Sequence, residues 1–320
     1  MNDPRTIKSG LRGVAFVAVL LMPLGLAALW ARLSTDGATE PPRAAMGSGV
    51  VPLPVPTSPL GRILAALPAD TTAVAALRVS EIAHLKALPI DEPGFEGLAR
   101  IIDVGTRCGI DPRRDLGVVV LAQRMHRLGR TREESDAQTA VFVQGRFDPA
   151  TFDVCRKELG AEGTVRWLNQ EIAVAALERA SDAFLNELFE DGPKLAKTSG
   201  FGQVVTRIPP GALAWGWMDM DAIRRARPDD VVPRTMFMAM EPADDASIRI
   251  LVQPTFESVA VAEAIEGQWR AMTSEAPEYA LGRRWKYRRA EEVLTATMEV
   301  PWSEIARNVE AIAPMIGALK

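Results

Sequence analysis

The residues that usually build metal centres and nucleophilic active sites are scarce in this chain. Its 320 residues include two cysteines and two histidines, Cys108, Cys155, His84 and His126. Their spacing fits none of the patterns that bring zinc ligands onto one turn or one helix face. Nothing in the sequence positions a histidine base beside either cysteine. The sequence therefore predicts no metal site, no cofactor and no cysteine nucleophile.

Motifs of the common enzyme classes are missing as well. The chain has no glycine loop to cradle a phosphate, no serine nucleophile elbow and no paired-histidine metalloprotease motif. Asp219 and Asp221 lie where a predicted strand leads into a helix that Asp221 would cap, and Glu241, Asp244 and Asp245 suit a strand end and a turn. The glycine that a calcium loop needs for its bend is missing there. No residue is predicted to be catalytic.

A surplus of positive charge is also absent. The formal net charge is -4 and the sequence pI is about 5.5, so the chain as a whole does not attract nucleic acid, and polyanion binding would have to be local. Only seven of the 37 basic residues are lysines. Together with abundant alanine, this preference for arginine is typical of GC-rich bacterial genomes.

A long apolar run near the N-terminus is the strongest single feature that is present. Residues 13–30 read GVAFVAVLLMPLGLAALW, about 18 residues without a charge, which at ~1.5 Å per residue nearly match the ~30 Å core of a bilayer. Arg5, Lys8 and Arg12 precede the run and only Arg32 follows it closely. The positive-inside rule therefore predicts a cytoplasmic N-terminus.

This run predicts a single-pass protein of the bacterial inner membrane. We assign residues 1–12 to a cytoplasmic head and residues 13–32 to a transmembrane helix or signal anchor, with everything that follows exported to the periplasm. The alternative is a cleavable signal peptide, because the tripeptide at residues 25–27 offers small residues at the spacing that a signal peptidase requires. The length of the run favours the anchor.

Residues 33–60 have the composition of a linker. Proline and glycine recur throughout this segment, which cannot bury enough apolar surface to form a core and favours extended conformations. We predict a flexible spacer between the membrane and the folded part of the chain.

From residue 61 onward, strand-like and helix-like segments alternate, and their order repeats. Residues 61–203 and 204–320 each predict the order β-α-β-β-α-β-β-α. Helix caps are expected at corresponding places in the two halves, at Ser80, Asp148 and Ser181 and at Asp221, Thr255 and Ser303. We predict two tandem repeats in an α+β fold, with mostly antiparallel sheets and helices packed on one face.

The stretch CGIDPRRD, residues 108–115, is predicted to connect a helix to a strand. Gly109 can adopt the left-handed conformation that ends a helix, and Pro112 prevents the helix from resuming. Asp111 suits a turn before the strand that begins at Leu116.

The two cysteines have a structural role if the chain is exported. An oxidising compartment favours a disulfide between Cys108 and Cys155. It would close a loop of about fifty residues, which is worth on the order of 4 kcal/mol in the chain-entropy model. The alternative is two buried thiols that are not bonded.

The stretch RRWKYRR, residues 283–289, concentrates positive charge. On a strand, alternation places Arg284, Lys286 and Arg288 on one face and the two aromatic residues on the other. One interpretation is an amphipathic strand with its aromatic residues in the core and a solvated basic face. The other is a binding face for an anionic partner such as lipid headgroups, lipopolysaccharide or a cell-wall polymer.

Trp215 and Trp217 share one face of another predicted strand. Core packing is the first interpretation, and a platform that stacks on glycans or lines a lipid cavity is the second.

These features predict a non-enzymatic binding or scaffold module of the cell envelope. Its partners would be the lipid bilayer, through the N-terminal helix, and an envelope protein or anionic polymer, with no nucleic acid. An envelope hydrolase with a carboxylate-based site and a carrier of a lipid-like ligand remain as alternatives.

Overall fold

The computed structural model describes the central and C-terminal parts of the chain. The described residues are 58–84, 109–111, 114–127, 136–146, 148–151, 165–176, 182–226, 228, 231–275, 284–302 and 304. The predicted membrane helix, the linker up to residue 57 and both cysteines lie outside them. No helix among the described residues is long and apolar enough to cross a membrane.

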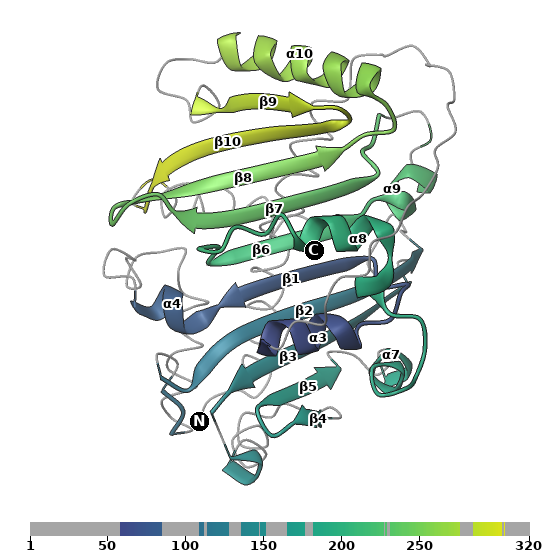
Figure 1. Cartoon of the computed structure of the whole chain (residues 1–320), viewed down its shortest axis with the longest axis vertical. Coiled ribbons are helices and arrows are strands. Elements are labelled where there is room, and N and C mark those ends of the chain that lie inside the picture. Colours follow the sequence, from purple (N-terminus) through teal and green to yellow (C-terminus); the bar gives the residue numbers. More distant parts are fainter. Residues whose placement is uncertain are drawn as a thin grey trace, which may run out of the picture.

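One antiparallel sheet dominates the fold and confirms the predicted α+β class (Figure 1). Its order is β4-β5-β3-β2-β1-β6-β7-β8-β10-β9. The strands are β1 (Ala73–Arg78), β2 (Leu116–Arg127), β3 (Asp136–Gly145), β4 (Val165–Asn169), β5 (Ile172–Ala176), β6 (Ala214–Asp219), β7 (Thr235–Pro242), β8 (Ser247–Thr255), β9 (Lys286–Ala290) and β10 (Val293–Pro301).

The strands of both predicted halves belong to this single sheet. They join where β1 pairs antiparallel with β6, with Ala75 opposite Gly216. Residue 203, where the predicted halves divide, lies in the helix Ser199–Val205 ahead of β6.

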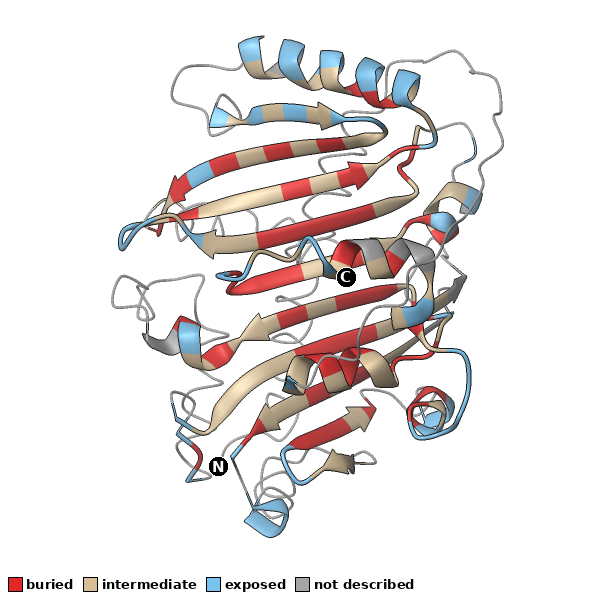
Figure 2. Cartoon of the chain, viewed as in Figure 1, coloured by how far each residue is buried: buried red, intermediate tan, exposed pale blue. Residues whose placement is uncertain are grey.

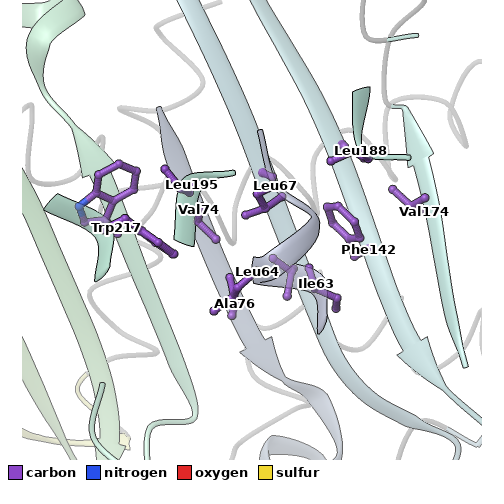
Figure 3. Packing of buried hydrophobic residues seen from close by; sticks show 14 of the residues in the cluster. Ile63, Leu64, Leu67, Val74, Ala76, Phe142, Val174, Leu188, Leu195 and Trp217 are labelled. Atoms are coloured by element: carbon purple, nitrogen blue, oxygen red, sulfur yellow. The ribbon is translucent and has the colours of Figure 1, made fainter. Parts of the chain in front are cut away.

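The larger hydrophobic core lies on one face of the sheet (Figure 3). Four helices contribute to the cover of this face: α3 (Pro59–Ala66), α7 (Asp182–Glu187), the 3₁₀ helix η2 (Leu195–Lys197) and α8 (Ser199–Val205). Ile63 of α3 and Leu67, which follows the helix, are fully buried in the same cluster as Val74 and Phe142 of the sheet. Ser58 begins α3, since its Oγ accepts a hydrogen bond from the Gly61 amide at 3.1 Å.

Helices also contact the opposite face, which differs from the prediction that they pack on one face. The helices there are α4 (Val79–His84), α9 (Asp221–Ala226) and α10 (Val259–Glu275). In β7, Phe237 joins the larger core, whereas its neighbours Met236 and Met238 join a second cluster with Trp269 of α10. Successive residues of a strand point to opposite faces. The central strands are apolar on both faces and need cover on both.

The turn before β2 follows the sequence prediction. Gly109 has φ of +69°, in the left-handed region. The Asp111 amide donates to Asp115 Oδ2 at 2.8 Å, and the Asp115 amide donates to the Asp111 carbonyl at 2.7 Å. These bonds close the turn, and β2 begins at Leu116 as expected.

The predicted helix caps are only partly correct. Asp148 Oδ2 accepts from the Thr151 amide at 2.9 Å, as a cap should. Asp221 is already the first residue of α9, and Asp219 Oδ1 accepts its amide at 2.8 Å instead. Thr255 ends β8, and Ser258 Oγ contacts the Val261 amide at 3.3 Å at the start of α10. Ser80 lies inside α4, while Ser181 and Ser303 lie outside the described residues.

Candidate functional site

The stretch RRWKYRR forms β9 and the residues that lead into it, at one edge of the sheet. Its neighbour β10 holds it in register, with Tyr287 opposite Ala296 and Arg288 opposite Thr295. Along β9, Lys286, Arg288 and Ala290 are exposed and the residues between them are partly buried, which Figure 2 shows as alternating colours. The strand is therefore amphipathic, as its alternation predicts.

The aromatic side of β9 packs under α10. The rings of Tyr287 and Trp269 lie 5.8 Å apart at a tilt of 54°. Tyr287 Oη and Thr273 Oγ1 share a hydrogen bond of 2.6 Å, and burial raises the pKa of the Tyr287 hydroxyl. Trp285 packs against the same apolar cluster as Trp269. Both aromatic residues are thus partly buried against this cluster, on the side that the first interpretation predicts.

Two arginines on this side are engaged by one carboxylate of α10. Arg270 Nη2 and Arg289 Nε donate to Glu266 at 2.7 Å and 3.1 Å. The hydrogen bond from Arg270 lowers the pKa of Glu266. Arg270 Nη2 also donates to the Tyr287 carbonyl at 2.8 Å. A helix and its arginine therefore flank the edge strand, which protects it from pairing with another strand.

The three residues of the predicted basic face are not equivalent. Arg284 lies just before β9 and forms a two-pronged ion pair with Glu304, at 2.8 Å and 3.1 Å. Lys286 and Arg288 are exposed, and neither forms an ion pair within the described part of the chain. Among the described residues, two of the three cations are therefore exposed without an ion pair.

Hydroxyl groups of β10 lie directly across from these two cations. Thr295 is opposite Arg288 and Thr297 is opposite Lys286 in the antiparallel register, so their side chains share one face of the sheet. Gln253 of β8 donates from Nε2 to Thr295 Oγ1 at 3.1 Å. A hydroxyl that accepts one hydrogen bond can also donate one.

Farther along the same face, the charges neutralise one another. Arg249 of β8 bridges its two neighbours, since Nη1 lies 2.9 Å from Glu241 of β7 and Nη2 lies 3.0 Å from Glu299 of β10. These hydrogen bonds raise the pKa of Arg249. The Glu299 carboxylate, which lies two residues from Thr297, is therefore already engaged by a cation.

The carboxylates considered for acid–base chemistry have structural partners. Asp219 caps the start of α9, and its burial raises the pKa of its carboxyl. Asp221 forms an ion pair with Arg224 at 3.2 Å, and Arg224 also pairs with Glu257. A cavity of about 10 Å³ beside Asp219 has room for at most one water molecule.

The acidic turn between β7 and β8 is a local structure, as the sequence predicts. Asp244 Oδ1 accepts from Ser247 Oγ and from the Ala246 amide, both at 2.8 Å. The hydrogen bond from Ser247 lowers the pKa of Asp244. Glu241 is held by Arg249 as described above.

The two tryptophans of β6 belong to the core. Trp215 and Trp217 are 2% and 5% exposed. Trp217 meets the Phe201 ring of α8 edge to face at 5.0 Å. The first interpretation, core packing, is correct, and the indole faces are not a platform for glycan stacking.

A buried arginine network was not anticipated from the sequence. Arg124 lies on the core face of β2, and its side chain is only 6% exposed. It donates to Glu187 of α7 from both terminal nitrogens, lies 2.9 Å from Asp70 and stacks 4.8 Å above the Phe184 ring. Burial opposes its charge, but these carboxylates prevail and raise the pKa of Arg124.

One signal in the sequence could have revealed this network. Val120 and Ala122 precede Arg124 at every second position on the core face, so the alternation continues through a charged residue. The strand β2 runs on through Arg124 to Arg127, and β3 begins at Asp136.

No group of three potential metal ligands occurs among the described residues. No protein-family model matches the chain, and no curated protein shows significant similarity to it.

Proposed function

We propose that this chain is a membrane-tethered module of the bacterial cell envelope that binds an anionic partner without catalysis. The observation that carries the proposal is the exposed face of β9, where Lys286 and Arg288 have no ion-pair partner among the described residues while neighbouring arginines do. Unneutralised cations on an otherwise acidic chain suit a local anion-binding face.

The tethered arrangement rests on the sequence. The apolar run at residues 13–30 would anchor the chain in the inner membrane, with the N-terminus cytoplasmic and the sheet in the periplasm. The linker at residues 33–60 would present the sheet at a distance from the bilayer, which raises its effective concentration near envelope partners.

The sheet supports a duplicated module. Counted outward from the β1–β6 junction, one half has the order β1-β2-β3-β5-β4 and the other has β6-β7-β8-β10-β9. The two orders correspond strand for strand, in the manner that the repeat proposed for residues 61–203 and 204–320 requires. A duplication would let one half, with its cationic β9, diverge for binding while both halves support the sheet.

A carboxylate hydrolase draws less support from the geometry. Asp219 and Asp221 are the closest approach to a carboxylate pair in a strand-to-helix junction, but one caps α9 and the other is paired with Arg224. We therefore favour binding over hydrolysis.

Two experiments test the proposed function. The first maps topology with a membrane-impermeant maleimide on spheroplasts, in a full-length variant whose native cysteines are serines and whose exposed Asp245 is cysteine. Labelling before lysis is expected, and protection until lysis would refute a periplasmic sheet. A matched Asn2→Cys variant should show the reverse pattern.

The second experiment measures retention of the full-length protein, in neutral detergent, on a heparin column. Replacing Arg284, Lys286 and Arg288 together by glutamine should lower the salt concentration needed for elution, because exposed charges act through screened Coulomb attraction. Unchanged elution would refute an anion-binding face on β9.

A further inference from the structure

We infer that the shared face of β9 and β10 binds phosphate groups through Lys286, Arg288 and the hydroxyls of Thr295 and Thr297. The inference rests on the proposed function and narrows it to one anion chemistry and four side chains. It also removes Arg284 from the binding group, because that residue is already paired with Glu304.

The geometry brings two cations and two hydroxyls into one small array. The register pairs Arg288 with Thr295 and Lys286 with Thr297. Residues directly opposite in an antiparallel pair have Cβ atoms about 5 Å apart, and alternate residues along a strand lie about 7 Å apart. The long side chains of Lys286 and Arg288 can therefore converge over the two threonines.

The four side chains of the array can all donate hydrogen bonds, and the acidic residues Glu291 and Glu292 lie in the turn that joins β9 to β10. The Lys286 ammonium and the Arg288 guanidinium donate only. Thr295 Oγ1 accepts from Gln253, and its hydroxyl can also donate a hydrogen bond. Glu299, the nearest acidic residue on the same face of β10, is held by Arg249 at 3.0 Å.

Such a donor-rich array matches an anion with several acceptor oxygens. The Arg288 guanidinium presents a planar fork that suits two phosphate oxygens, and Lys286 adds a compact charge. Hydroxyl donors can satisfy the remaining oxygens. A carboxylate offers two oxygens only and would leave part of the array unused.

At this edge strand, a ligand would be bound through side chains and not through the backbone. Arg270 occupies the Tyr287 carbonyl, and α10 runs along the β9 end of the sheet (Figure 1). Helix α10 and Arg270 therefore hinder a peptide from pairing with β9 as an additional strand. The cationic face remains open because it points away from the aromatic contacts with α10.

The test uses full-length protein in neutral detergent and three soluble probes of matched charge: polyphosphate, polyglutamate and heparin. Tighter binding to polyphosphate than to polyglutamate is expected. Lys286→Gln with Arg288→Gln should weaken polyphosphate binding by about tenfold, since each exposed charge-assisted contact contributes a factor of a few. Thr295→Val with Thr297→Val should reduce the preference for polyphosphate over polyglutamate while both charges remain.

A matched control removes two exposed cations elsewhere. Lys197 and Arg207 are exposed and lie on η2 and just after α8. Lys197→Gln with Arg207→Gln gives the same change in net charge and should leave polyphosphate affinity within about twofold of the wild type. An equal loss in both double variants would overturn the site and would indicate attraction by net charge alone.

A second arm identifies the source of the phosphate. Protein reconstituted in phosphatidylcholine vesicles is mixed with separate phosphatidylglycerol vesicles, and vesicle clustering is measured by light scattering. Clustering that depends on Lys286 and Arg288 assigns the site to lipid headgroups, and polyphosphate binding without clustering assigns it to a soluble phosphate polymer. Equal affinity for polyglutamate and polyphosphate would overturn phosphate recognition while leaving the proposed anion-binding function intact.

Discussion

The buried network around Arg124 makes an asymmetric prediction about stability. The Arg124 side chain is 6% exposed, whereas its partners Glu187 and Asp70 are 42% and 57% exposed. Replacing a carboxylate leaves a buried cation without part of its compensation, but replacing the cation leaves carboxylates that water can solvate. Loss of the acids should therefore cost more than loss of the base.

The expected magnitudes follow from these exposures. Removing every partner of a buried charge costs about 3–5 kcal/mol. Glu187→Gln keeps the 2.9 Å ion pair with Asp70, and partial exposure screens the lost attraction, so we expect about 2 kcal/mol. Adding Asp70→Asn leaves the neutral acceptor Gln138 Oε1, 3.2 Å from Arg124 Nη1, and should bring the loss to about 3 kcal/mol. Arg124→Met, which still covers the Phe184 ring, should cost less than about 1.5 kcal/mol.

Thermal unfolding of the full-length protein in neutral detergent, followed by circular dichroism, provides the assay. For a folded unit of this size, about 2 kcal/mol corresponds to a fall in Tm of about 4–8 °C. Glu190→Gln is the matched control, because Glu190 is exposed just after α7, and it should shift Tm by less than about 2 °C. If Arg124→Met destabilises more than the Asp70→Asn and Glu187→Gln double variant, the reasoning is refuted.

Three further predictions concern single positions. Burial raises the pKa of Asp219, so ionisation of this carboxyl opposes folding. This loss of stability grows as pH rises through the folded-state pKa. Asp219→Asn should therefore raise Tm at pH 7 and leave Tm unchanged near pH 3, which thermal unfolding measured at a series of pH values will test. Gly109 has φ of +69°, and nothing lies within 4 Å of an added Cβ. Gly109→Ala should therefore lower the free energy of unfolding by about 1–2 kcal/mol through backbone strain alone, and Gly109→Asn should lower it less. If urea unfolding finds the alanine variant as stable as the wild type, this prediction is wrong. Ser58→Ala removes the cap of α3 and should cost about 1 kcal/mol, whereas Ser58→Asp should retain most of the stability in the same urea titration.

Local features of this chain were predictable because their causes are local. The alternation through residues 285–288 places aromatic and cationic side chains on opposite faces of any strand, and β9 follows it. Gly109 and Asp111 form the expected turn because φ preferences and short side-chain bonds act over a few residues. The caps Asp221 and Thr255 were wrong by a few residues, because several nearby polar side chains compete for the same amides.

The availability of the basic face depended on distant contacts. Arg284, Lys286 and Arg288 look alike in the sequence, but Glu304, 20 residues from Arg284, pairs with it alone among the three. Arg124 is likewise buried because Glu187, 63 residues away, reaches it from α7. The sequence does not show which cation a given carboxylate will pair with, because the partner depends on how the helices pack on the sheet.

The sequence by itself determined the α+β class, the strand alternation and the amphipathic character of β9, because side-chain period and turn chemistry require only near neighbours. Tertiary structure decided that β1 pairs with β6, so that both halves share one sheet with helices on both faces. It also decided which cations of the described residues form ion pairs with carboxylates. These outcomes depend on the register and packing of segments far apart in the chain, where burial on each face selects among pairings that local pattern leaves equivalent.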